Sequence, residues 1–133
     1  MQDAKRLQRI EQILEEIQML ADEGGLIIVE GQKDKAALNE LGISGEILLA
    51  SHPPLFNFAE SISRKANAAI IMTDWDSKGK MLAKKMSTYL RSSGLKPDLR
   101  LRGKLRKLVQ KEIKDVEGLS RYVRALRYKV HER

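Results

Sequence analysis

The sequence predicts an α/β domain in which helices cover a parallel sheet of about four strands. Short apolar runs such as Leu26 to Glu30, which reads LIIVE, are typical of strands buried on both faces. They alternate with segments whose apolar residues recur at helical spacing, as in right-handed βαβ units. Helices on both faces of such a sheet make three layers. A chain of 133 residues fits one domain, 1–133.

The N-terminal segment, residues 1–23, is predicted to be an amphipathic helix that ends before Gly24 and Gly25. One side of this helix is strongly apolar, so it packs either on its own domain or on a second copy of the chain. We expect packing on its own domain, while a homodimer stays open. The apolar stripe consists of Leu7, Ile10, Leu14, Ile17 and Ala21, with Ile13 and Leu20 beside it.

Residues 26–102 are predicted to form the core of the domain. Asp34 is expected to cap its first helix and Gly42 to end that helix. The inward residues of the third core helix are expected to include Met81, Leu82, Met86 and Leu90. The expected strands are Leu26 to Glu30, Glu46 to Ala50, Ala68 to Thr73 and Asp98 to Arg102, and the expected helices are Lys33 to Leu41, Phe56 to Ala66 and Ser77 to Arg91.

Residues 103–133 are predicted to form a basic tail of two helices. Apolar residues recur at helical spacing from Leu105 to Val116 and again from Leu119 to Val130. The net charge is +7, and from Arg91 onward 14 Lys and Arg face 5 Asp and Glu, so the surplus is entirely C-terminal. This asymmetry fits either a polyanion partner or a solvated helix face. The candidate phosphate-contacting residues are Arg100, Arg102, Lys104, Arg106, Lys107, Lys111, Arg121, Arg124 and Arg127.

Three acidic residues follow predicted strands at one edge of the sheet. Glu30 ends the first strand, and Asp74 and Asp76 come directly after the third. Ligands of open α/β sheets bind at this edge, and side chains two apart in extended backbone lie ~6.6 Å apart along the strand. Clustered carboxylates resist ionisation unless a cation neutralises them, and oxygen ligands suit Mg²⁺ or Mn²⁺. Taken singly, each of these acids also fits a helix cap or a solvated residue.

Two segments carry a family resemblance. Ile28 to Asp34, which reads IVEGQKD, and Thr73 to Gly79, which reads TDWDSKG, resemble the signature segments of the Toprim domain. That domain, a Rossmann-like fold, is shared by bacterial-type primases, topoisomerases and ribonuclease M5. The resemblance implies that Glu30 is a general acid or base or a metal ligand. It also implies that Asp74 and Asp76 bind Mg²⁺.

Several neighbouring residues are candidates for supporting roles. Gly31 and Gly79 are expected where the backbone turns sharply or approaches a ligand closely. Lys33 and Lys78 could meet phosphate oxygens or remain solvated. Trp75, between the two aspartates, is expected to pack against the core or its edge rather than to stack on a base. His52 and Glu117 are open cases: His52 is expected to be structural or exposed, and Glu117 joins the site if the tail folds back.

The resemblance favours a small stand-alone Toprim protein similar to ribonuclease M5, because the chain is too short for the additional domains of topoisomerases and primases. The expected activity is Mg²⁺-dependent cleavage or processing of RNA, with RNA favoured over DNA. The alternative is a non-catalytic, metal-dependent module that binds nucleic acid within a larger processing, replication or repair assembly. A phosphate-ester hydrolase acting on small molecules is the third possibility.

Composition points to a reducing compartment. Cysteine is absent, which excludes disulfides, thiolate metal sites and a cysteine nucleophile. No apolar run approaches the ~20 residues that span a bilayer, and the N-terminus has no signal-peptide core. We therefore expect a cytoplasmic protein without a membrane partner.

Overall fold

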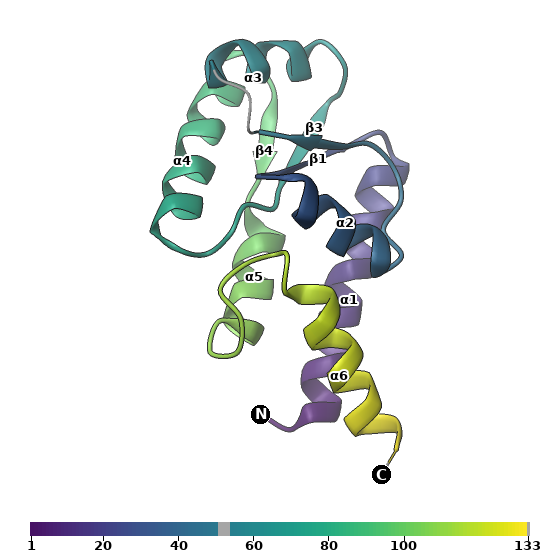
Figure 1. Cartoon of the computed structure of the whole chain (residues 1–133). Helices are drawn as coiled ribbons and strands as arrows, with labels where there is room; N and C mark the ends of the chain where they lie inside the picture. Colours follow the sequence, from purple (N-terminus) through teal and green to yellow (C-terminus); the bar gives the residue numbers. More distant parts are fainter. Residues whose placement is uncertain (51–53, 133) are drawn as a thin grey trace.

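The structure of this chain, a computed structural model, describes residues 1–50 and 54–132. The described residues form a parallel four-stranded sheet in the order β2-β1-β3-β4, with helices on both faces (Figure 1). The predicted α/β class and its three layers are therefore confirmed. The elements in chain order are α1 (Asp3–Asp22), β1 (Leu26–Val29), α2 (Gln32–Glu40), β2 (Ile47–Leu49), α3 (Leu55–Ser63), β3 (Ala68–Ile71), α4 (Ser77–Ser92), β4 (Lys96–Asp98), α5 (Arg100–Val109) and α6 (Leu119–His131).

Strand β1 is central and buries every side chain. Because side chains alternate along a strand, Ile27 and Val29 face one hydrophobic core while Leu26 and Ile28 face another. The first core is closed by α1, α2, α5 and α6, and the second by α3 and α4. A strand buried on both faces explains why the LIIVE run is apolar throughout instead of alternating with polar residues.

Helix α1 packs within its own chain, as predicted. It contacts α5 and α6, and α6 runs beside it to the end of the described chain (Figure 1). Its stripe is spaced so that one face enters the core while the charged residues stay outside. The buried residues of α1 are Leu7, Ile10, Ile13, Leu14 and Ile17.

The fourth strand lies two residues earlier than predicted. Pro97 lies within β4 and pairs with Ala69, which an edge strand tolerates because one side of its backbone needs no partner. The carboxylate of Asp98 then accepts a hydrogen bond from the backbone amide of Arg100 at 2.9 Å, which begins α5. Arg100 and Arg102 are therefore helical, and the predicted strand Asp98 to Arg102 was wrong.

Three smaller predictions also need correction. Asp34 does not cap α2 from outside: Gly31 is the capping position, and the Asp34 carboxylate accepts the Gly31 amide hydrogen bond at 3.0 Å from within the first turn. Met81 is 59% exposed, so it does not face inward. The first tail helix ends at Val109, because the segment from 110 to 118 is held by contacts with the sheet edge. Gly42 ends α2 with a positive φ of 91°, as expected.

Candidate metal and nucleic-acid site

The candidate site lies where β1 and β3, which are neighbours in the sheet, end. The amide of Met72 donates to the carbonyl of Ile28 at 2.8 Å, so strand pairing continues past β3. Two residues further on, the backbone amide of Asp74 donates to Oε2 of Glu30 at 2.7 Å. The two strand ends are thereby fastened to each other through one of the predicted acids. Glu30 and Asp74, 44 residues apart in the chain, are brought together.

The segment between α5 and α6 folds back onto this edge. Oδ1 of Asp74 accepts a hydrogen bond from the backbone amide of Val116 at 2.8 Å. Nε1 of the neighbouring Trp75 donates to the carbonyl of Ile113 at 2.7 Å, and its ring packs against the first core. The prediction that Trp75 packs at the core edge is therefore confirmed. These two bonds fix the Asp74 loop to the tail.

Asp76 begins helix α4. Its Oδ1 accepts a hydrogen bond from the amide of Gly79 at 2.7 Å, and its side chain is exposed. The carboxylate therefore acts as an N-cap, the alternative that spacing left open. Its placement differs from that of Glu30 and Asp74, which are both partly buried.

Gly79 is required by close packing. A Cβ built at this position would lie 1.9 Å from the backbone oxygen of Asp74, which no side chain can tolerate. The carbonyl of Gly79 also accepts a hydrogen bond from the buried Thr73 hydroxyl at 2.8 Å. The expected close approach at Gly79 is confirmed, with the Asp74 backbone as the approaching group. Gly31 differs, because a Cβ there would meet only Asp34, at 4.0 Å.

Negative charge accumulates around Asp74. Burial raises the pKa of Asp74 to about 6, the Val116 amide opposes this shift, and the charge of Glu30 adds to it. Burial likewise raises the pKa of Asp34 to about 6, with the charge of Asp74 as the next cause. The site thus holds more carboxylates than its surroundings neutralise, which favours a cation.

Sequence reasoning missed two acids of this neighbourhood. Asp34, which we expected only to cap a helix, is 7% exposed and senses the charge of Asp74. Asp115 raises the pKa of both Asp34 and Asp74, and its carboxylate accepts the Gly118 amide at 2.9 Å. The signal for Asp34 was its place inside the first signature segment. Asp115 had no signal, since only the fold of the tail brings it near.

The expectation that Glu117 approaches the site is met in part. Its carboxylate lies 3.9 Å from the amine of Lys33, with both side chains largely exposed, and its charge reaches Asp34. An exposed pair at this distance contributes little to stability. Lys33 therefore remains free to meet a phosphate. His52 lies outside the residues that the structure describes.

Arg102 supports the acids from beneath. It is 8% exposed, its Nε donates to the carbonyl of Thr73 at 2.9 Å, and a terminal nitrogen donates to the carbonyl of Asp74. Burial lowers the pKa of Arg102, while the charges of Glu30, Asp74 and Asp76 oppose that shift. The guanidinium is committed to the backbone. The geometry therefore does not support the predicted phosphate contact and makes Arg102 a positioning residue.

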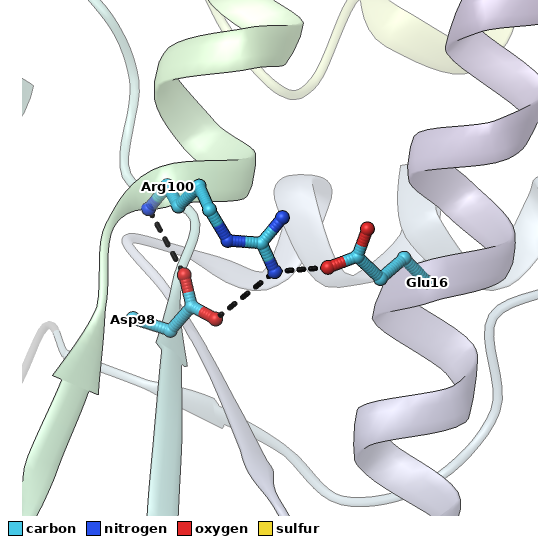
Figure 2. Close-up of polar contacts among 3 residues, drawn as sticks. All are labelled: Glu16, Asp98 and Arg100. Carbon is cyan, nitrogen blue, oxygen red and sulfur yellow. Dashed lines mark hydrogen bonds and ion pairs between the residues drawn. The ribbon is translucent and has the colours of Figure 1, made fainter.

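Arg100 is also engaged within the protein. Figure 2 shows its guanidinium between Glu16 of α1 and Asp98 of β4. Its hydrogen bond to Glu16 lowers the pKa of that carboxyl group. These contacts tie α1 to the start of α5. They leave Arg100 poorly placed for the predicted contact with nucleic acid.

The donor chemistry fits a hard divalent cation. Glu30, Asp74 and Asp76 offer only oxygen, and Mg²⁺ needs one or two protein carboxylates besides water and phosphate. Within residues 1–50 and 54–132, no group of three or more His, Asp or Glu side chains is close enough to hold one ion. The predicted convergence is thus seen for Glu30 and Asp74, with Asp76 at the adjacent helix cap.

Comparison with known proteins agrees with this geometry. Residues 25–117 match the family model described as the Toprim domain. A UPF0292 protein of Methanosarcina barkeri is 53% identical over 94% of this chain and 87% of its own length. A UPF0292 protein of Thermococcus sibiricus is 37% identical over 95% of both chains. A protein of known structure from Aquifex aeolicus superposes with a TM-score of 0.69 at 25% identity, covering 80% of this chain and 94% of that one.

The chain therefore belongs to the Toprim domain family, and within it to the UPF0292 proteins. The family assigns it a metal-dependent function on nucleic acid, either enzymatic or in binding. None of the helices in the described part of the chain is both long and apolar enough to cross a membrane.

Proposed function

We propose that this chain is a Mg²⁺-dependent phosphodiesterase that cleaves or processes RNA in a manner similar to ribonuclease M5. The observation that carries the proposal is the pairing of Glu30 with Asp74 at the ends of adjacent strands. Their proximity raises the pKa of Asp74, so charge repulsion is stored where a cation would relieve it. Asp76 stands at the adjoining helix start and completes the proposed ligand set.

Each acid has a distinct proposed role. Asp74 and Asp76 hold the ion, since each uses one oxygen for a backbone amide and keeps the other for a ligand. Glu30 is oriented through Oε2, which leaves Oε1 to take a proton from water or return one to the leaving oxygen. When bound, Mg²⁺ or Mn²⁺ supplies charge stabilisation at the scissile phosphate. Lys33 and Lys78 are proposed to meet neighbouring phosphates.

The test is cleavage of labelled structured RNA with Mg²⁺ or Mn²⁺, repeated with Asp74→Asn and Glu30→Gln. Both variants keep an oxygen that can accept the native backbone hydrogen bond while removing the charge. We expect each to lower the cleavage rate by a factor of about 10² to 10⁴, the usual range for a lost acid–base group. Cleavage that persists in both variants would place the activity elsewhere.

A second candidate function is metal-dependent binding of nucleic acid without turnover. It is favoured by the lack of a preassembled three-acid cluster among the described residues. Binding that weakens with salt and is unaccompanied by product, in Mg²⁺ or Mn²⁺, would select this function. Nucleotides and other small phosphate esters serve as the comparison substrates, because hydrolysis of those alone would select the small-molecule alternative.

A further inference from the structure

Helix α4 bears a cationic face that no acidic residue neutralises. Its sequence contains five basic residues and no acid, although the charge count placed the basic surplus only in the tail. The tail differs, because three of its arginines form ion pairs with glutamates or aspartates of other elements. Within the part of the chain that is described, the basic residues of α4 are exposed and form no ion pair: Lys78, Lys80, Lys84, Lys85 and Arg91.

Exposed apolar side chains lie among these lysines. Met81 is 59% exposed and borders a groove of about 440 Å³ together with Lys84, Lys85, Thr88 and Tyr89. The groove therefore offers an apolar floor beside two ammonium groups.

The apolar surface continues onto the neighbouring helix α3. The ring of Phe56, 46% exposed, meets that of Tyr89 edge to face, with centroids 5.7 Å apart. Exposed Met and Phe side chains bordered by lysines are an unusual solvent surface for a small domain. Together, the groove and Phe56 form a surface that we call the α4 face.

The α4 face leads away from the acidic site. Helix α4 begins at Ser77, directly after Asp76, and the close contact of Gly79 with the Asp74 backbone locks its first turn in place. Lys78, Met81 and Lys85 share one side of the helix by their spacing of three and four residues. At 1.5 Å per residue, the side from Lys78 to Lys85 extends about 10 Å from the site.

We propose that the α4 face binds a single-stranded stretch of nucleic acid next to the phosphate that the acidic site holds. The lysines would contact the sugar-phosphate backbone, and Met81 with the Phe56 and Tyr89 rings would contact an unstacked base. A duplex would leave the apolar groove unused, because its bases are already stacked. The inference deepens the proposed function and rests on it for the position of the reacting phosphate.

The experiment measures fluorescence anisotropy of short labelled single strands of RNA and of DNA, and of the matching duplex, in EDTA. The double variant Lys84→Ala/Lys85→Ala should bind single strands about tenfold more weakly. Its dependence on log salt should fall by about 1.4, or about 0.7 for each phosphate released. Met81→Gln should weaken binding about threefold without changing that slope. All three side chains are exposed, so the fold should be retained.

The matched control is Lys104→Ala/Lys107→Ala, which removes the same charge from the exposed face of α5. We expect it to bind single strands much as the wild type does. Equal losses in both double variants, or duplex binding as tight as single-strand binding, would overturn the proposal. So would preferential binding of an acidic peptide, or a dimer that Met81→Gln dissociates. Equal loss of RNA and DNA binding would show that the face reads the shared strand chemistry.

This test is separable from that of the catalytic proposal. Asp74→Asn should retain binding to the α4 face, because the lysines and Met81 are unchanged. If the wild type cleaves RNA but Lys84→Ala/Lys85→Ala binds normally, the α4 proposal fails and the proposed function stands. If Lys84→Ala/Lys85→Ala loses binding but the wild type never cleaves, the α4 face stands and the catalytic proposal fails.

Discussion

The carboxylate of Glu30 accepts a hydrogen bond from the backbone amide of Asp74 at 2.7 Å. The bond links the ends of two neighbouring strands, and it makes one acidic side chain the support of another. Asp74 in turn accepts the Val116 amide and presents its backbone oxygen to Arg102. Substitutions at Glu30 therefore have both a structural and a chemical effect, and these can be separated.

Glu30→Ala is expected to destabilise the protein by about 1 to 2 kcal/mol, because the partly buried Asp74 amide loses its acceptor. Glu30→Gln keeps an acceptor oxygen at the same place and should change stability by less than about 0.5 kcal/mol. Urea denaturation of both variants measures the difference. Both should lose the proposed cleavage activity. Equal stability of the two variants would show that the hydrogen bond contributes nothing.

Gly79→Ala is expected to destabilise the protein by more than about 2 kcal/mol. The added Cβ would lie 1.9 Å from the Asp74 oxygen, and relief requires α4 to move away from the site. Gly103→Ala in α5 is the matched control, since its Cβ meets nothing within 4 Å and should be neutral or stabilising by up to about 1 kcal/mol. Thermal unfolding of both variants tests the contrast. A similar change in the two would contradict the packing argument.

The fold followed from sequence because its strands are apolar on both faces and its helices are periodic. The errors occurred where a local signal yielded to tertiary contact. Pro97 suggested the end of a helix, whereas an edge strand accommodates it. Ile113 and Val116 continued a helical pattern, but their backbone groups bond Trp75 and Asp74 instead of the preceding turn.

The candidate site was predictable only in part. The signature segments located Glu30, Asp74 and Gly79, because strand ends and D-x-D-x-x-G spacing are local features. The approach of Asp115 and the burial of Arg102 depend on how the tail packs against the sheet edge. Ion pairing was equally invisible, so sequence alone overstated the free charge of the tail and understated that of α4.

The raised pKa of Asp74 predicts a specific dependence of stability on pH. The folded protein holds this proton more tightly than the unfolded chain, since burial raises the pKa from its ordinary 3.8 to about 6. The associated stabilisation is present below about pH 4 and lost as the pH rises past about 6. Asp74→Asn removes the charge, so its stability relative to wild type should increase over this window by about 1 kcal/mol after solvent screening.

Denaturant titrations of wild type and Asp74→Asn across this pH range measure the effect. Other carboxylates titrate in both proteins, so only the difference between the two curves is interpreted. Asp34 shifts in the same direction and remains in both. A difference that does not vary with pH would mean that Asp74 ionises normally in the folded state.

Divalent metal is expected to stabilise the folded protein above about pH 7, where Asp74 is ionised. Binding to the native state alone adds about 2.7 kcal/mol when the metal is at 100 times its Kd. The thermal midpoint should rise with Mg²⁺ or Mn²⁺ and return with EDTA. Asp74→Asn should lose most of this rise, whereas Glu112→Gln, at an exposed acid of the 110–118 segment, should keep it. An equal rise in Asp74→Asn would place the ion elsewhere.

Trp75→Phe is expected to loosen the tail from the acidic site without unfolding the domain. Phenylalanine keeps most of the packing but removes the Nε1 hydrogen bond to the Ile113 carbonyl, a loss of about 1 kcal/mol. Because the same segment supplies the Val116 amide to Asp74, that amide should exchange with solvent about fivefold faster, which hydrogen-exchange NMR measures. Tyr128→Phe, at an exposed ring in α6, should leave the rate unchanged. If Val116 exchanges equally in both variants, Trp75 does not couple the tail to Asp74.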